Sequence, residues 1–211
     1  MKAGGFISKE ELLKEYTNKR NFSKTPEPSG EQQKAGGSQI FVIQKHRASN
    51  LHYDFRLEIQ GVLVSWAVPK GPSTNPSERR LAMPTEDHPL EYANFEGVIP
   101  EDEYGAGTVM VWDNGYYRNL RSEKEDDGAA MKQSYDEGKI EVWLEGKKLK
   151  GGYALIRTSS GSNERWLLIK MDDQEADARR KPTSTENESV LSGRTLEEIK
   201  KDEAAEENSS S

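Results

Sequence analysis

The sequence predicts an all-β fold, either a barrel or a sandwich. Apolar and polar side chains alternate over residues 51–59, which is the period of a strand with one buried face. A second apolar run, residues 62–68, follows Gln60-Gly61, a dipeptide typical of a tight hairpin turn. With further short runs, these give about eight strands and almost no helical periodicity, as in barrels and sandwiches. The further runs begin at Ile40 and at residues 81, 108, 116, 140, 153 and 166.

The N-terminal residues predict a helix followed by an arm. Residues 9–19 are expected to form one short helix, with Ser8 as the N-cap and Glu11 at the position of a capping box. Residues 25–37 carry two prolines and three glycines, which predicts an irregular connector.

Later in the chain, Asn114-Gly115 predicts a two-residue hairpin turn between two strands. Residues 121–138 are charged and contain glycine, and we expect a loop with one helical turn there. From about residue 172 the apolar pattern ends and Glu, Asn and Ser dominate, which predicts a mobile tail. The expected organisation is an N-terminal helix and arm (1–38), a β-barrel or sandwich domain (39–171) and a flexible, disordered acidic tail (172–211).

Composition excludes several classes of protein. The 211 residues suggest one domain, or one domain with long tails. The chain has no cysteine, which excludes disulfides, thiolate metal sites and cysteine nucleophiles, and fits a reducing cytoplasm. No apolar run approaches the ~18 residues that a membrane helix needs, and the N-terminus has no apolar signal core. We therefore expect a cytoplasmic protein with no membrane association.

The negative charge is concentrated in the tail. The whole chain has a formal net charge of -7, from 30 Lys and Arg against 37 Asp and Glu. Residues 172–211 carry 6 basic and 12 acidic side chains, a net of -6, which leaves -1 for the rest. The acidic total therefore does not exclude an anionic ligand for the body, and we expect the tail to be dispensable for activity.

Candidate metal ligands gather around the first predicted hairpin. The chain has three histidines, His46, His52 and His88. Alternate residues of a strand share a face, so His52, Asp54 and Arg56 should point the same way, with His46 arriving from the preceding strand or turn. Two imidazoles and a carboxylate suit Mn²⁺, Fe²⁺ or Zn²⁺ and leave coordination positions open for water and substrate. The alternative is the solvent face of an amphipathic strand.

Two further groups of side chains indicate an anionic ligand. His88 and Tyr92 lie in a polar stretch and could approach a ligand held by a metal, although His88 could also belong to a capped turn before Pro89. Arg56, Lys70 and Arg80 could complete a phosphate site, because fixed cations match the charge and geometry of a phosphate; each could also be an ordinary surface charge. No Ser or Cys nucleophile stands out, so direct attack by water is expected.

Several long motifs in one order resemble the 3′-phosphoesterase module of bacterial DNA ligase D and its free-standing bacterial and archaeal relatives. They are FVIQKH at 41–46, LHYDFRLE at 51–58, SWAVPKGP at 65–72, EDHPL at 86–90, FEGVIP at 95–100 and EYGAG at 103–107. The resemblance covers roughly residues 12–171. It implies an eight-stranded β-barrel with a divalent metal, usually Mn²⁺, with Co²⁺ or Zn²⁺ as other candidates. It also implies removal of a 3′-terminal ribonucleoside from DNA and then of the resulting 3′-phosphate, in DNA repair by non-homologous end joining.

The resemblance further implies partners and residue roles. The partners would be RNA-terminated or plain DNA 3′ ends at primer-template junctions, with a DNA ligase, polymerase or Ku acting in trans, and the chain would be a monomer. The metal ligands would be His46, His52 and Asp54. The catalytic residues Arg56, His88 and Tyr92 would contact the scissile phosphate, and Lys70 and Arg80 would make further phosphate contacts. The supporting residues would be Gln44, Glu86, Arg20 and Glu27.

One position departs from the family pattern. The ligase D arm reads Arg-Asp-Phe, whereas this chain has Arg20-Asn21-Phe22. Because Asn carries no charge and a carboxylate there could orient Arg20, we expect removal of the ribonucleoside to survive and hydrolysis of the 3′-phosphate to be weak or absent.

Two other functions compete with this one. In an iron-dependent oxygenase, His52, Asp54 and His88 would form a two-histidine, one-carboxylate triad, which leaves His46 and the cations without a role. In a non-catalytic module that binds nucleic-acid ends, the metal would have only a structural role and would stabilise the fold.

Overall fold

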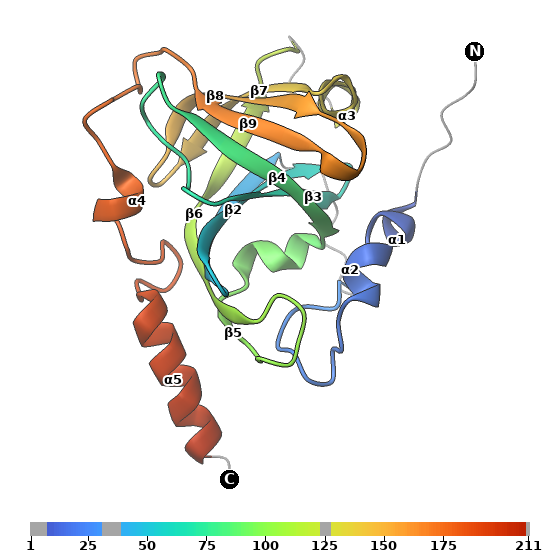
Figure 1. The fold of residues 1–211 in the computed structure, drawn as a ribbon, viewed down its shortest axis with the longest axis vertical. Coiled ribbons are helices and arrows are strands. Elements are labelled where there is room, and N and C mark those ends of the chain that lie inside the picture. Colours follow the sequence, from blue (N-terminus) through green and yellow to red (C-terminus); the bar gives the residue numbers. More distant parts are fainter. Residues whose placement is uncertain (1–7, 31–38, 123–127, 210–211) are drawn as a thin grey trace.

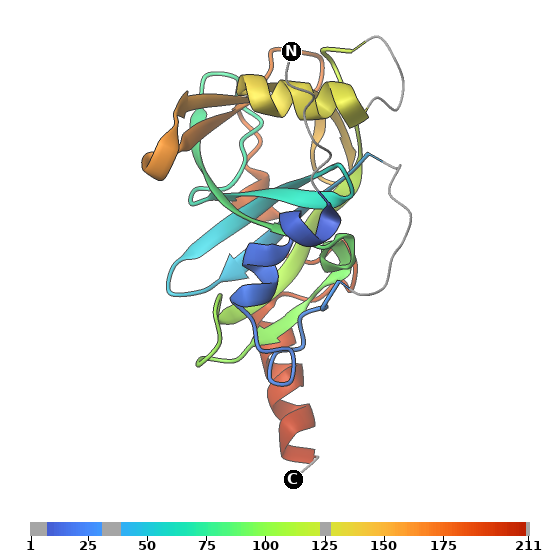
Figure 2. The ribbon, with the colours of Figure 1, turned by 90° about the vertical axis from the view of Figure 1, so that its right-hand side faces the viewer.

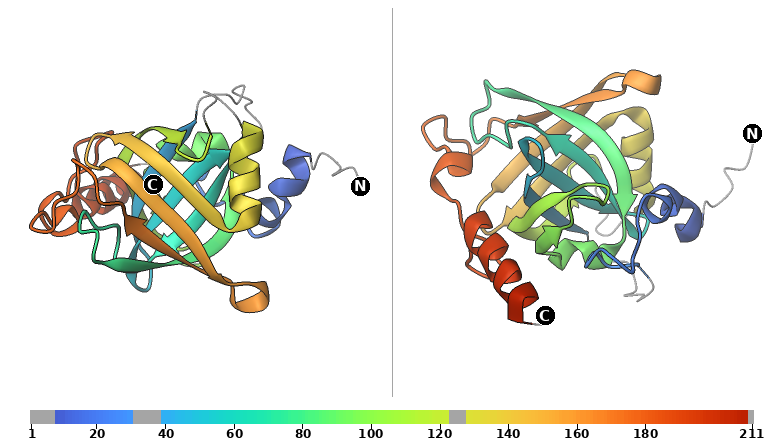
Figure 3. Two further views of the ribbon diagram at one scale, coloured as in Figure 1. Left: turned by 90° about the horizontal axis from the view of Figure 1, so that it is seen from above. Right: turned by 60° about the horizontal axis from the view of Figure 1, so that its bottom comes forward.

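A computed structural model describes residues 8–30, 39–122 and 128–209. Eight antiparallel strands form a closed barrel in the order β1-β2-β3-β4-β9-β8-β7-β6, which the pairing of β1 with β6 closes (Figures 1 and 3). The strands are β1 (Ile40–Arg47), β2 (Leu51–Ile59), β3 (Val62–Val68), β4 (Arg79–His88), β6 (Gly107–Asn119), β7 (Lys139–Gly146), β8 (Lys150–Ser159) and β9 (Arg165–Lys170). A ninth strand, β5 (Gly97–Ile99), pairs with the first part of β6. The predicted eight-stranded barrel is confirmed.

The barrel interior is apolar and comes from one face of each strand. Phe55, Trp66 and Trp166 are fully buried there, with residues of every barrel strand around them. The alternation over residues 51–59 predicts this face, except at Leu51, which is 42% exposed because it begins β2 next to the β1–β2 turn, before the pairing with β3 starts. The predicted turn at Gln60-Gly61 is present, and both residues have positive φ (54° and 81°), as a tight β-hairpin requires.

A second apolar layer covers the outer face of β1, β3 and β6. It is built from the N-terminal helix α2 (Lys14–Asn18), the short 3₁₀ helix η1 (Leu90–Asn94) and β5. The preceding helix, α1 (Lys9–Leu12), packs through Leu12 against the barrel-interior cluster. Ser8 caps α1 as predicted, since its hydroxyl accepts a hydrogen bond from the Glu11 amide. Figure 2 shows α1 and α2 lying against the outside of the barrel. Polar residues of β1 and β2 on this outer face are therefore enclosed, which positions the site described below.

The predicted hairpin at Asn114-Gly115 is wrong. Both residues lie inside the long strand β6, which pairs with β1 along one edge and with β5 and then β7 along the other. Gly115 is required there for close packing, because a Cβ would lie 2.1 Å from the Glu145 carbonyl oxygen. The dipeptide thus serves close approach of two strands and not a turn.

The segment before β7 holds more helix than predicted. Residues 128–137 form α3 (Gly128–Glu137), which packs on the barrel through buried Met131. Tyr135 stacks on Trp166 with ring centroids 5.7 Å apart. A second 3₁₀ helix, η2 (Gly161–Asn163), links β8 to β9.

The expectation of an unstructured tail from residue 172 is also wrong. The segment contains α4 (Pro182–Thr185) and α5 (Leu196–Ser209), the second of which extends away from the barrel (Figures 1 and 2). It is tied to the barrel by a hydrogen bond from the Trp112 indole to the Glu186 carbonyl (2.6 Å) and by burial of Leu196 and Ile199. A few spaced apolar residues therefore attach this acidic segment to the barrel. The reason for expecting the segment to be dispensable for activity, its lack of an apolar pattern, no longer holds.

No helix in the part of the chain that the structure describes is long and apolar enough to cross a membrane.

Candidate metal and phosphate site

The β1–β2 hairpin brings the three predicted metal ligands together. Its register sets His46 directly opposite His52 and Gln44 opposite Asp54. The Asp54 carboxylate lies between the two rings, 3.6 Å from His46 Nδ1 and 3.6 Å from His52 Nε2. One donor atom from each of the three residues falls within 4.8 Å of the others, a spacing that suits a shared metal ion.

Three properties of these residues fit a divalent cation. His46 Nε2 is buried and has no hydrogen-bond partner among the residues that the structure describes. His52 Nδ1 lies 3.0 Å from the Asn50 carbonyl, which fixes the ring and leaves Nε2 available, as in many metal-binding histidines. Burial alone would raise the pKa of Asp54, but Arg56 and the two histidines lower it to about 2, so the carboxylate is charged at neutral pH.

Arg56 connects this cluster to the rest of the site. Its Nη2 lies 3.2 Å from the Asp54 carboxylate, and its Nε donates to Gln44 Oε1 at 2.8 Å. Its Nη1 donates to the Ser65 hydroxyl at 2.8 Å. Gln44 in turn donates to the carbonyls of Tyr92 and Phe95, so it supports Arg56 and anchors η1.

His88 is enclosed by cations and aromatic rings. Its Nδ1 lies 2.8 Å from Arg56 Nη1 and its Nε2 3.3 Å from Arg20 Nη2. Burial, with the positive charges of Arg56 and Arg20, holds the pKa of His88 well below its usual value. The Tyr92 ring packs edge-on 4.6 Å away, and burial raises the pKa of its hydroxyl well above the usual range. Both groups are therefore neutral in the free protein at neutral pH.

The N-terminal arm delivers a second guanidinium to the site. Arg20 Nε lies 2.8 Å from Glu27 and Arg20 Nη1 lies 3.1 Å from Glu86, and all three side chains are buried. Burial would raise the pKa of Glu86, but a backbone hydrogen bond, Arg20 and Lys19 lower it, so the Arg20–Glu86 contact is a charged ion pair. The arm is thus held against β4 by buried carboxylates.

Asn21 does not face Arg20. Its side-chain oxygen accepts hydrogen bonds from the Ser23 amide (3.2 Å) and the Ser23 hydroxyl (2.7 Å), which closes a local turn. Since Glu27 and Glu86 already orient Arg20, the structure removes the physical reason for expecting weak hydrolysis of the 3′-phosphate.

These side chains line one cavity of about 210 Å³. Nearly all of the site residues predicted from the sequence line this cavity or support a residue that lines it. The lining residues are His46, His52, Asp54, Arg56, His88, Tyr92, Arg20 and Glu86. Gln44 supports Arg56, and Glu27 supports Arg20. Lys70 and Arg80 do not line it, and lie instead on a separate cavity.

Three further residues of the site are not among the site residues predicted from the sequence. Tyr16 is fully buried. Its ring centroid lies 3.8 Å from Cζ of Arg20 and 5.0 Å from the centroid of the His88 ring. Tyr104 lies near Lys19 and Glu86 at the cavity edge, and Ser65 receives a hydrogen bond from Arg56. The sequence signals, a lone aromatic in a helix and a hydroxyl in a strand, are too common to indicate a site.

The fold and site define a class of protein, a β-barrel with a candidate His-His-Asp metal site beside two buried guanidinium groups. Residues 44–157 match the family model described as the DNA ligase D 3′-phosphoesterase domain, and the chain belongs to this family.

Curated relatives agree with this membership. The chain is 46% identical over 189 residues to the multifunctional non-homologous end joining protein LigD of Pseudomonas aeruginosa. It is 48% identical over 163 residues to the multifunctional non-homologous end joining DNA repair protein LigD of Mycobacterium tuberculosis. These alignments cover 87% and 77% of this chain but only 22% and 20% of the relatives, so the chain spans about a fifth of their length.

Proposed function

We propose that the chain is a manganese-dependent phosphoesterase that processes the 3′ ends of DNA. It removes a 3′-terminal ribonucleoside and then the 3′-phosphate that remains. The observation that carries the proposal is a single cavity in which a His-His-Asp cluster adjoins Arg56 and His88. Guanidinium groups that would bind an anion lie beside residues that would hold a divalent cation, and this combination suits a phosphate ester as substrate.

His46, His52 and Asp54 would hold the metal. Manganese suits this mixture of imidazole and carboxylate, as do Co²⁺ and Zn²⁺. A divalent ion held there would supply Lewis-acid chemistry, that is, a lower pKa for a bound water and polarisation of a phosphate oxygen. The depressed pKa of Asp54 keeps the carboxylate available to the ion at neutral pH.

Arg56, His88 and Tyr92 bind the reacting phosphate. Arg56 is held by Gln44 and Ser65 before substrate arrives, so its guanidinium needs little reorganisation to stabilise the charge that develops on the phosphoryl group. His88 is neutral in the free protein and offers an N–H as a hydrogen-bond donor. A bound phosphate would raise its pKa, which moves His88 toward protonating the leaving oxygen.

The family and the relatives' names support a role in non-homologous end joining. The substrate in this proposal is a 3′ end at a primer-template junction, with a ligase, polymerase or Ku as partners in trans. The domain limits 1–38, 39–171 and 172–211 and a monomeric, cytoplasmic form are part of the same proposal. Lys70 and Arg80 then contact a phosphate other than the reacting one.

A labelled primer-template with one 3′-terminal ribonucleotide tests the proposal. With Mn²⁺, the purified chain should convert it to a 3′-phosphate end and then to a 3′-hydroxyl end, which a gel resolves. A control primer without the ribonucleotide separates end-specific processing from general nuclease activity. DNA binding without any product would instead favour the non-catalytic end-binding module.

The oxygenase alternative is disfavoured by the position of His88. Both of its ring nitrogens lie within 3.3 Å of a guanidinium, a setting that repels a metal cation. The metal-binding cluster found in the described part of the chain includes His46 in its place.

A further inference from the structure

Tyr104 is an exposed aromatic side chain at the rim of the candidate active site. It lies in the loop between β5 and β6, and 48% of its surface is accessible to solvent. Among the large apolar and aromatic side chains that are exposed in the described ranges, Tyr104 is the one that lines the site cavity. The roles assigned above to the metal ligands and to the phosphate-binding residues leave this ring without a function.

Contacts from the arm and from β4 hold the Tyr104 ring in place. Lys19 Nζ lies 4.5 Å from the ring centroid and donates a hydrogen bond to the Tyr104 hydroxyl at 3.2 Å. The hydroxyl also lies 3.5 Å from Oε2 of Glu86, a buried carboxylate that pairs with Arg20 and Lys19. The orientation of the ring is therefore set before substrate binds, although nearly half of the side chain stays accessible.

The loop that carries Tyr104 is anchored as well. A turn hydrogen bond runs from the Glu103 amide to the Pro100 carbonyl (3.1 Å). Gly107, at the end of the loop, has a φ of +137°, and a Cβ there would lie 2.2 Å from the Arg47 carbonyl oxygen. The loop thus packs directly on the end of β1, and a larger residue than glycine could not make this approach.

A short series of contacts leads from the phosphate-binding residues to Tyr104. Arg56 Nη1 lies 2.8 Å from His88 Nδ1, and His88 Nε2 lies 3.3 Å from Arg20 Nη2. Arg20 Cζ in turn lies 5.7 Å from the centroid of the Tyr104 ring. A group attached to a phosphate held by Arg56 and His88 would therefore lie within reach of the ring.

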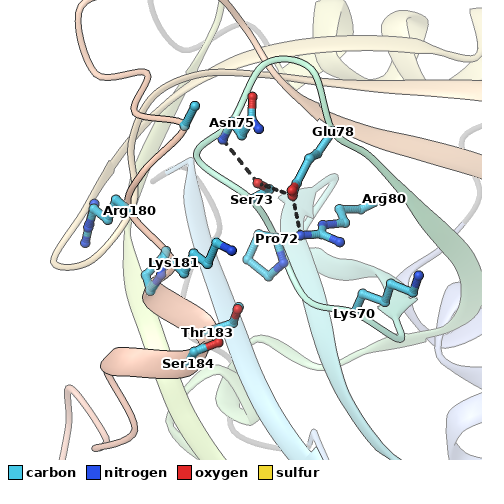
Figure 4. Close-up of a pocket in the computed structure, with 12 residues that line it drawn as sticks. Lys70, Pro72, Ser73, Asn75, Glu78, Arg80, Arg180, Lys181, Thr183 and Ser184 are labelled. Carbon is cyan, nitrogen blue, oxygen red and sulfur yellow. Dashed lines mark hydrogen bonds and ion pairs between the residues drawn. The ribbon is translucent and has the colours of Figure 1, made fainter.

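In the proposed function, the body of the DNA strand lies on the other side of the reacting phosphate. Lys70 and Arg80, which that function assigns to a different phosphate, line a separate cavity (Figure 4). They follow β3 and begin β4, whereas Tyr104 contacts Glu86 near the opposite end of β4. A strand whose body passes Lys70 and Arg80 therefore presents its terminal nucleoside to Tyr104.

We infer that Tyr104 is the stacking platform for the base of the 3′-terminal ribonucleoside. An aromatic ring stacks on any base, because every base has a π face. Stacking needs no hydrogen bond to a base edge, so the site accepts a terminal nucleoside of any sequence. The ring aligns the nucleoside that leaves while Arg56 and His88 hold the phosphate. This inference rests on the proposed function, since it takes a DNA 3′ end as the occupant of the cavity.

Removal of single bases from the DNA tests the inference by binding alone. Three fluorescent primer-templates are compared by anisotropy without added metal: an intact 3′-ribonucleotide end, one whose terminal ribose lacks its base, and one whose penultimate sugar lacks its base. Wild type should bind the terminally abasic primer about tenfold less tightly than the intact one. Tyr104→Leu should bind the intact primer about tenfold less tightly and lose at most about twofold on removal of the terminal base. Removal of the penultimate base should affect both proteins equally.

Two further variants separate stacking from other roles of the side chain. Tyr104→Phe keeps the ring and loses the hydroxyl contacts with Lys19 and Glu86, and it should retain the response to the terminal base. Tyr116→Leu removes another exposed tyrosine, on β6 and outside the cavity, and should behave as wild type. Thermal melting of each variant checks that the fold is unchanged.

The outcomes separate this inference from the proposed function. Equal sensitivity of wild type and Tyr104→Leu to loss of the terminal base would overturn the inference, even if 3′-end processing is intact. A difference between them at the penultimate base alone, or loss of the response in Tyr104→Phe, would overturn it too, since the ring would then stack elsewhere or act through its hydroxyl. A difference at the terminal base that Tyr104→Phe retains supports the inference even if the chain does not cleave, because the readout is binding.

Discussion

The Arg56 guanidinium joins the two halves of the candidate site, with Asp54 on one side and His88 on the other. Period-2 alternation in β2 predicts that Arg56 shares a face with His52 and Asp54, because this is a local property of a strand. The proximity of Arg20 and His88 depends on how the arm and β4 pack, which local sequence does not encode. For the same reason the separation of Lys70 and Arg80 from the first cavity could not be predicted.

The buried, neutral His88 predicts a loss of stability on acidification. Its folded-state pKa lies well below the ordinary 6.5, so below that pH the unfolded chain binds a proton that the folded chain does not. Stability is therefore full above about pH 6.5 and falls below it, by up to about 1.4 kcal/mol per pH unit for this one group. Urea unfolding of wild type and His88→Gln at pH 7.5, 6 and 5 measures the effect. The slope below pH 6.5 should be steeper in wild type, and identical slopes would contradict the assignment.

Asn21→Asp should leave both catalytic steps within about twofold of wild type. Asn21 closes its own turn with Ser23, while Glu27 and Glu86 orient Arg20. Arg20→Lys is the informative comparison, because an ammonium cannot reproduce the guanidinium fork between two carboxylates, and it should slow 3′-phosphate hydrolysis at least about tenfold. The ratio of 3′-phosphate to 3′-hydroxyl product on a gel measures both. A gain in the hydroxyl product for Asn21→Asp would restore the interpretation drawn from the sequence alone.

The sequence predicts most of the strands, but it does not predict how segments that are distant in the chain pack against each other. Residues 51–68 predict β2, its turn and β3 because alternation and a positive-φ dipeptide act locally. Asn114-Gly115 has the same local signal, but pairing of β6 along both of its edges overrides it. In the C-terminal segment only a few apolar residues dock, too few to give a pattern against the acidic background.

Ile199→Ala tests the docking of α5. Ile199 is fully buried in the same apolar cluster as the barrel interior, so the truncation should cost about 2–5 kcal/mol of unfolding free energy. The adjacent Lys200→Ala, at an exposed position, should stay within about 0.5 kcal/mol of wild type. Chemical denaturation of both variants gives the comparison. A cost for Ile199→Ala no larger than that of Lys200→Ala would mean that α5 is not docked in solution.

Over the whole molecule, positive and negative side chains concentrate on different surfaces. The net charge is -7, yet cations converge on both cavities. Two of the six basic residues after position 171, Arg180 and Lys181, line the cavity that also holds Lys70 and Arg80, while acidic residues predominate on α5. A polyanion can therefore approach one face of an acidic protein, and its binding should weaken as salt rises.

The proposed function divides the site into two parts. His46, His52 and Asp54 would hold the metal, and Arg56, His88 and Tyr92 would bind the phosphate. Calorimetric titration with Mn²⁺ of wild type, His52→Ala and His88→Ala, paired with turnover of a 3′-ribonucleotide primer, tests it most directly. Loss of a metal ligand should cost His52→Ala at least about a hundredfold in Mn²⁺ affinity, with loss of activity. His88→Ala should keep Mn²⁺ affinity within about threefold while turnover falls by about a hundredfold or more. Wild-type Mn²⁺ affinity in His52→Ala, or equal loss of metal in both variants, would contradict this division of the site.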